Sequence, residues 1–197
     1  MTEPYQYTLS ELRDRFTGAS EFVEALRTKS EEQLLHRPAE GAWNTSDICS
    51  HLAVFGTLFQ DEAERAVEKA NPAPRGEGPF RAKWVVRKLA AMMEPPYKTR
   101  LRAPAKMRPK TESPEGDGDP IGALLAVEAR TRDMLARAKE EQWDLRRIKG
   151  KHPIIPLLPM SLIDLLVVID VHRRRHFWQI EQTLPAQPGP AGAADTP

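Results

Sequence analysis

The stretch LIDLLVVIDVHRRRHFWQI, residues 162–180, decides the fold class of this chain. Its apolar side chains recur three and four positions apart, which is the period of an α-helix that is buried along one face. These positions are Leu162, Leu165, Leu166 and Ile169. Ser161 is a suitable N-cap, and Asp164 three residues later completes a capping box. The pattern predicts a long final helix that ends near Thr183.

Two histidines continue the apolar face of this helix. The same period reaches His172 and His176 and then Gln179 and Ile180, so both histidines are expected to face the core. Histidines four residues apart on a helix lie side by side, and one metal ion can reach both at about 2.0–2.1 Å. A metal binds the neutral ring and so avoids repulsion between two buried imidazolium groups. The arginines 173–175 are expected on the flanks and outer face, paired with acidic residues, or alternatively as a clamp for an anion.

A second predicted helix supplies a third histidine. Asn44 is its N-cap, Asp47 is its third residue, and the helix ends before Asn71. His51 lies at the edge of its apolar face, and ligands in helical bundles come from facing helices. We therefore expect His51 to meet His172 and His176. Three imidazoles suit zinc or nickel and leave a position for water, as in catalytic sites. The alternative is three polar core residues that bind no metal.

The rest of the chain predicts helices and loops. Further helices are expected at 8–29, 80–93 and 119–138, and an extended segment at 152–159. A long loop is expected at 104–120, which either covers the site or is an insertion. No strand pattern is evident, so the fold class is all-α, a bundle in which four of five helices are long. We expect one domain over residues 1–184 and a disordered tail over 185–197. His36 and His152, beside prolines, are expected at the surface.

Composition narrows the possible partners. The chain has 29 basic and 28 acidic side chains and a net charge of +1. A nucleic-acid-binding domain usually has a basic excess, so nucleic acid is not an expected partner. The longest apolar stretch, 162–171, contains two aspartates and is too short to cross a membrane. A single cysteine, Cys49, and the lack of a signal-peptide pattern favour the cytoplasm.

Two motifs resemble the DinB-like (YfiT-like) superfamily of helical-bundle metalloproteins. WNTSDICSHL, residues 43–52, is similar to the element of that family that carries its first histidine, although Asp47 stands where the family often has glutamate. HRRRHFWQI, residues 172–180, is similar to the pattern of the family's final helix. The resemblance spans about residues 8–183. It implies an up-down four-helix bundle with a short extra helix and long loops. It also implies one divalent metal ion, Zn²⁺ or Ni²⁺, held by His51, His172 and His176.

The resemblance also implies a class of chemistry. Members include metal-dependent hydrolases and transferases that use low-molecular-weight thiols, so the expected partner is a small-molecule substrate or such a thiol. In both, the ion activates water or a thiol. Asp47 and Gln179 are candidate hydrogen-bonding partners of the ligand imidazoles, although we expect them to be a helix cap and an ordinary polar residue. The alternative is a non-catalytic binding or stress-response module, with or without metal. A homodimer is expected by analogy.

Overall fold

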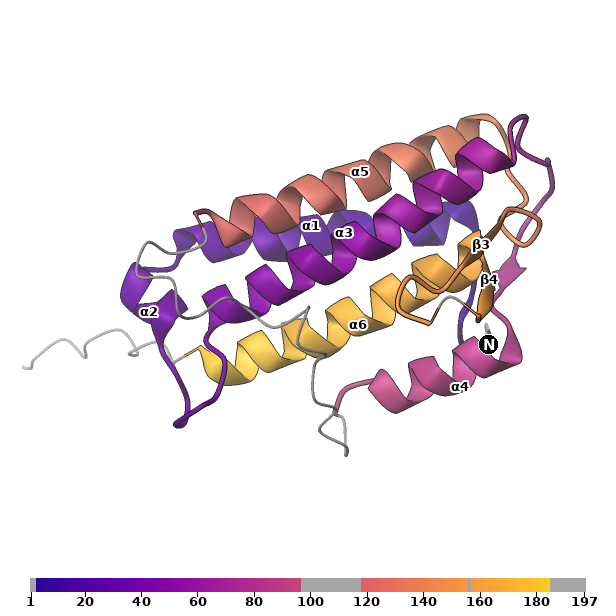
Figure 1. The fold of residues 1–197 in the computed structure, drawn as a ribbon. Coiled ribbons are helices and arrows are strands. Elements are labelled where there is room, and N and C mark those ends of the chain that lie inside the picture. Colours follow the sequence, from indigo (N-terminus) through magenta and orange to yellow (C-terminus); the bar gives the residue numbers. More distant parts are fainter. Residues whose placement is uncertain (1–2, 97–117, 156, 185–197) are drawn as a thin grey trace, which may run out of the picture.

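A bundle of four long helices forms the body of the molecule (Figure 1). The computed structural model describes residues 3–96, 118–155 and 157–184. The long helices are α1 (Leu9–Ala25), α3 (Thr45–Lys69), α5 (Pro120–Glu140) and α6 (Leu162–Thr183). The short helix α4 (Trp84–Met93) packs against α6 from outside the bundle. The predicted helical bundle with a short extra helix is confirmed. Most of the predicted 104–120 loop and the tail 185–197 lie outside the described residues.

The ends of the long helices follow the predicted capping chemistry. Reciprocal capping boxes begin α1, α3 and α6, with Thr8, Asn44 and Ser161 as their N-caps. At the start of α5 the carboxylate of Asp119 accepts the amide of Gly122 at 2.8 Å, and proline occupies the first helical position. Each cap satisfies amides that have no partner inside the helix. The start of each long helix is therefore encoded locally.

The first predicted helix, 8–29, is shorter in the structure. The α-helical part ends at Ala25, and the 3₁₀ helix η1 (Leu26–Thr28) follows. The hydroxyl of Ser30 then accepts the amide of Gln33 and begins a further short helix, α2 (Glu31–Leu35). None of the residues of α2 is buried, so this helix has no apolar period that sequence analysis can detect.

The expectation of no strands is wrong in detail. Strand β1 (Gln6–Tyr7) pairs with β2 (Phe80–Arg81), and β3 (Lys149–Lys151) pairs with β4 (Pro159–Ser161), both antiparallel. Strands of two or three residues are too short to show alternation in the sequence. The pairing of β2 also explains why the helix predicted at 80–93 begins only at Trp84. The segment predicted as extended at 152–159 turns back on itself, since the amide of His152 donates to the carbonyl of Leu158 at 2.9 Å.

The directions of the helices follow from the long connection that contains α4. Among the long helices, α1 and α3 are antiparallel, as are α5 and α6, but α3 and α5 run the same way, which corrects the up-down order expected above (Figure 1). Gly56 packs against Val127, and four residues later along both helices the hydroxyl of Thr131 donates to the side chain of Gln60 at 2.8 Å. Both residue numbers rise together, as they do between parallel helices. A Cβ atom at Gly56 would lie 2.8 Å from Cγ1 of Val127. The glycine therefore lets α3 and α5 approach closely.

Helix α6 is buried nearly all round, which corrects one expectation. Arg173 and Arg175 are buried rather than on an outer face, because α6 contacts α3 and α4 and is also bonded to α1 through Arg15. The expected pairing with acids is confirmed for two of the arginines. Arg173 bonds the carboxylates of Glu128 and Asp170, at 2.7 and 3.0 Å, and Arg174 bonds Glu94 and Asp170. A network of buried charges therefore joins α6 to α1 and α5.

Among the helices that the structure describes, none is both long enough and apolar enough to cross a membrane.

Candidate metal centre

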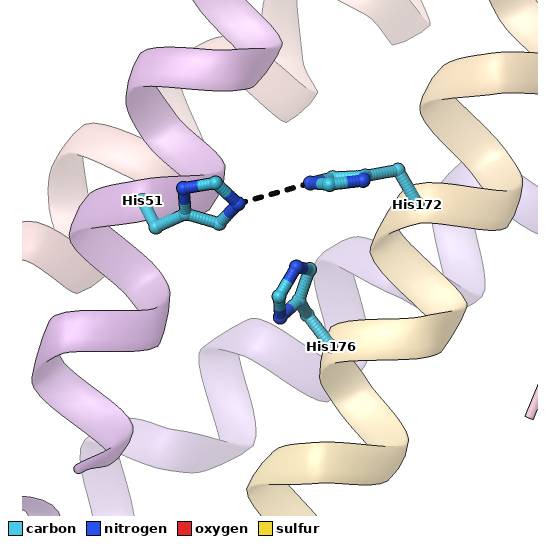
Figure 2. A group of neighbouring side chains, drawn as sticks. All are labelled: His51, His172 and His176. Atoms are coloured by element: carbon cyan, nitrogen blue, oxygen red, sulfur yellow. Dashed lines mark hydrogen bonds between the residues drawn. The ribbon is translucent and has the colours of Figure 1, made fainter. Parts of the chain in front are cut away.

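Three histidines from two antiparallel helices meet inside the bundle (Figure 2). His51 comes from the second turn of α3, and His172 and His176 from consecutive turns of α6. The Nε2 atoms of His51 and His172 are 3.0 Å apart, and one ring nitrogen from each of the three residues lies within 4.8 Å of the other two. The predicted convergence of residues distant in sequence is observed.

Burial lowers the pKa of the two histidines on α6. His51 and His176 are buried, at 2% and 7% exposure, while His172 is partly exposed. Burial is the main cause that lowers the pKa of His176 to about 3, and the charge of His51 adds to it. Burial likewise places the pKa of His172 well below its usual range, with contributions from His176 and His51. The neutral ring has a lone pair on one nitrogen, which is the form that binds metals.

Gln179 orients one of the three rings. Its Oε1 atom lies 2.9 Å from Nδ1 of His176, one turn earlier on α6. An amide oxygen accepts, so Nδ1 of His176 carries the proton and Nε2 has the lone pair. Metal-binding histidines typically have this kind of support on the nitrogen that does not bind the ion. Gln179, expected as an ordinary polar residue, thus contacts an imidazole of the cluster.

Asp47 is held by its own neighbours. Its carboxylate accepts the backbone amide of Asn44 at 3.2 Å as part of the capping box, and it pairs with Arg37 at 2.6 Å. Both contacts fix the start of α3, one turn before His51. These contacts give Asp47 the helix-capping role that its position in the sequence indicates.

Aromatic rings enclose the histidines. Phe55, one turn after His51 on α3, stacks on His172 with ring centroids 3.8 Å apart and planes 14° apart. Trp43 lies against His51, at 4.9 Å between centroids, and is stacked at 6.3 Å from His176. In the sequence, Trp43 stands just before the predicted helix, as the first residue of the 43–52 motif, and Phe55 stands on the apolar face of that helix. The signal for Phe55 was its spacing of four from His51, which places both side chains on one face.

The buried guanidinium of Arg175 adds positive charge beside the cluster. Its charge lowers the pKa of both His172 and His176. The residue is only 6% exposed. A positive potential next to these rings disfavours imidazolium and favours an anionic group nearby.

The donor set fits a divalent metal ion. Nitrogen ligands at about 2.0–2.1 Å from one tetrahedral ion are about 3.3 Å apart. The observed separations, from 3.0 Å up to at most 4.8 Å, bracket that value. Neutral imidazoles are ligands for borderline ions such as zinc and nickel. The cluster is the only group of three or more histidine, cysteine or acidic side chains with this closeness in the described part of the chain.

The remaining histidines lie away from the cluster. His36 is exposed, as expected. His152 is buried at 6% exposure, so the expectation of a surface residue is wrong. Its Nδ1 atom accepts the amides of Ile154 and Ile155, both at 3.1 Å, and its ring meets the edge of Phe59. The adjacent proline therefore marks an exposed turn whose amides bond the buried ring of His152.

Two surface cavities lie elsewhere in the molecule. One, of about 320 Å³, lies between α3 and α5 and is lined by Glu64, Arg130 and Trp143 among others. The other, of about 370 Å³, lies beside the N-terminal residues 3–7 and the start of α1. Neither is lined by the three histidines.

Comparisons with known proteins identify relatives of this fold. The model of the DinB superfamily matches residues 16–180. Among solved structures the chain is similar to YfiT from Bacillus subtilis, with 15% identity and a TM-score of 0.53 over 89% of this chain and 85% of that one. That protein is described as "a probable metal-dependent hydrolase with an unusual four-helix bundle topology". None of the curated proteins matches.

Proposed function

This chain belongs to the DinB superfamily, and from that membership we propose that it is a metal-dependent hydrolase whose ion is held by His51, His172 and His176. The observation that carries the proposal is the meeting of three largely buried imidazoles at one point of the bundle. The description of YfiT as a probable metal-dependent hydrolase supports the same reaction class. Zinc and nickel are the ions that we propose, because their preferred ligands include imidazole.

The roles of the residues follow from their contacts. When bound, the ion would lower the pKa of a water ligand and polarise a substrate carbonyl. Gln179 keeps the proton of His176 on Nδ1 and so directs the lone pair of Nε2 into the cluster. Arg175 supplies positive potential that would favour a substrate with an anionic group.

The proposal is tested with untagged protein that has been stripped by a chelator and reloaded with zinc or nickel. Simple esters, amides and adducts of low-molecular-weight thiols are supplied as substrates. We expect hydrolysis by the reloaded protein but not by the stripped protein. His51→Ala should abolish it while the circular dichroism spectrum is retained, and His36→Ala, a change at an exposed histidine, should retain it.

Two outcomes would contradict a hydrolase. Full activity in His51→Ala would place the reaction elsewhere in the molecule. Turnover that requires a free thiol as co-substrate would instead identify a thiol-dependent transferase, which uses the same ion to activate sulfur rather than water.

A further inference from the structure

The three histidines are supported in different ways. His176 has a hydrogen bond from Nδ1 to Gln179. Within the described part of the chain, the hydrogen-bonding contact of His172 is confined to its Nε2 atom, which faces His51. Metal-binding histidines usually have a hydrogen bond on the other ring nitrogen to fix the orientation of the ring. The orientation of the His172 ring therefore needs another source.

Phe55 supplies a contact that fixes the plane of this ring. The two rings are nearly parallel, at 14°, and their centroids are 3.8 Å apart. Among the described residues, no other ring lies parallel to His172, since the rings of His51 and His176 are inclined to it by 54° and 63°. Stacked rings resist tilting because a tilt opens the contact on one side.

Phe55 belongs to a row of buried aromatic rings on α3. It stacks on Phe59 with centroids 4.4 Å apart, and Phe59 meets His152 edge-on at 5.1 Å. Both phenylalanines are buried, at 6% and 0% exposure. Because Phe55 is one turn after His51, the same face of α3 provides one imidazole and holds another.

We propose that Phe55 is a positioning residue of the metal centre, which holds the imidazole of His172 in the plane required for ligation by stacking in place of a hydrogen bond. This inference rests on the proposed metal-binding function. It assigns the two α6 ligands to two different supports, Gln179 for His176 and Phe55 for His172.

The matched pair of variants is Phe55→Leu and Phe59→Leu. Each removes one ring of the same stack from α3, but only the first removes the contact with His172. In metal-free protein, the ring protons of His172 should lie upfield in the NMR spectrum because they are over the face of Phe55. Phe55→Leu should move them downfield, whereas Phe59→Leu should leave them nearly unchanged. A His172→Gln spectrum provides the assignment.

The second readout is the affinity for zinc, measured by competition with a chromophoric chelator. We expect Phe55→Leu to weaken binding roughly three- to tenfold and to alter the cobalt(II) absorption spectrum, and Phe55→Tyr to restore both. Phe59→Leu should stay within about twofold of the wild type. Equal losses in the two leucine variants, or an unshifted His172 resonance in Phe55→Leu, would overturn the proposal. If the wild type binds no zinc, the proposed function fails, and the NMR comparison still decides whether Phe55 fixes the ring.

Discussion

Gln179 supports the ring of His176, with Oε1 of the amide 2.9 Å from Nδ1 of the imidazole. We predict that Gln179→Ala lowers the affinity for zinc by about 10- to 100-fold, the usual cost of losing such a partner. Gln179→Glu keeps an acceptor and should retain most of the affinity. The measurement is zinc binding by competition at constant pH.

Gln182 provides the control for this prediction. It is an exposed glutamine one turn further along α6, so Gln182→Ala removes the same side chain without touching the cluster. Its zinc affinity should equal that of the wild type. An equal loss in both variants would mean that the C-terminal turns of α6 had simply loosened.

Asp47 should affect stability rather than metal binding. Asp47→Ala removes the capping contact with Asn44 and the ion pair with Arg37. We expect the free energy of unfolding in urea to fall by about 1–2 kcal/mol, as for other lost caps. Zinc affinity should change by less than about threefold, because neither contact involves an imidazole. A large loss of affinity with unchanged stability would show that the carboxylate supports His51 after all.

Much of the fold was readable from local chemistry. The capping boxes at Thr8, Asn44 and Ser161, and the helical periods that follow them, are encoded within a few residues, so they could be predicted without tertiary contacts. The convergence of His51 with His172 and His176 was also predictable, because apolar faces must meet in a bundle. In contrast, the parallel course of α3 and α5 depends on a long connection that no local pattern specifies.

The predictions that the structure corrects concern residues that are covered by segments distant in the sequence. Arginine is usually a surface residue. Arg173 is nevertheless buried against Glu128 of α5. His152 lies beside a proline, but Phe59 of α3 covers its ring. The stacking of Phe55 on His172 joins two helices, and a sequence period shows only that Phe55 faces inward.

We predict that His152 makes the free energy of unfolding depend on pH. Burial lowers its pKa below the usual value, and protonation of Nδ1 would remove the acceptor for two amides. The unfolded chain then binds more protons than the folded one as the pH falls through about 6.5. The stabilisation that neutral His152 provides is therefore complete above that pH and is lost progressively below it.

The test compares the wild type with His152→Asn from pH 5 to 8 by urea unfolding. The Oδ1 atom of asparagine can replace Nδ1 as an acceptor but does not titrate. The difference in unfolding free energy between the two proteins removes the common contribution of the three clustered histidines. We expect the wild type to lose stability relative to the variant as the pH falls. A difference that is constant with pH would contradict the assignment of His152.

Removal of one partner from the buried ion pair between Glu128 and Arg173 should lower the free energy of unfolding. Glu128 and Arg173 are 3% exposed each and pair at 2.7 Å, and burial raises the pKa of Glu128 despite the favourable effect of Arg173. Glu128→Leu leaves the guanidinium of Arg173 buried, with Asp170 as its remaining carboxylate partner. We expect a loss of about 3–5 kcal/mol in urea unfolding. The double variant Glu128→Leu/Arg173→Met should recover part of it, and a double variant less stable than Glu128→Leu would refute this account.

The metal content of untagged protein tests most directly whether the three histidines hold an ion. The protein is produced in medium with ample zinc and nickel, and its metals are measured by elemental mass spectrometry. We predict about one divalent ion per chain in the wild type, and a near-complete loss after dialysis for His51→Ala, His172→Ala and His176→Ala, each still folded. His36→Ala should match the wild type. A folded wild type that neither retains nor takes up an ion, or a triple histidine variant that retains one, would contradict the account.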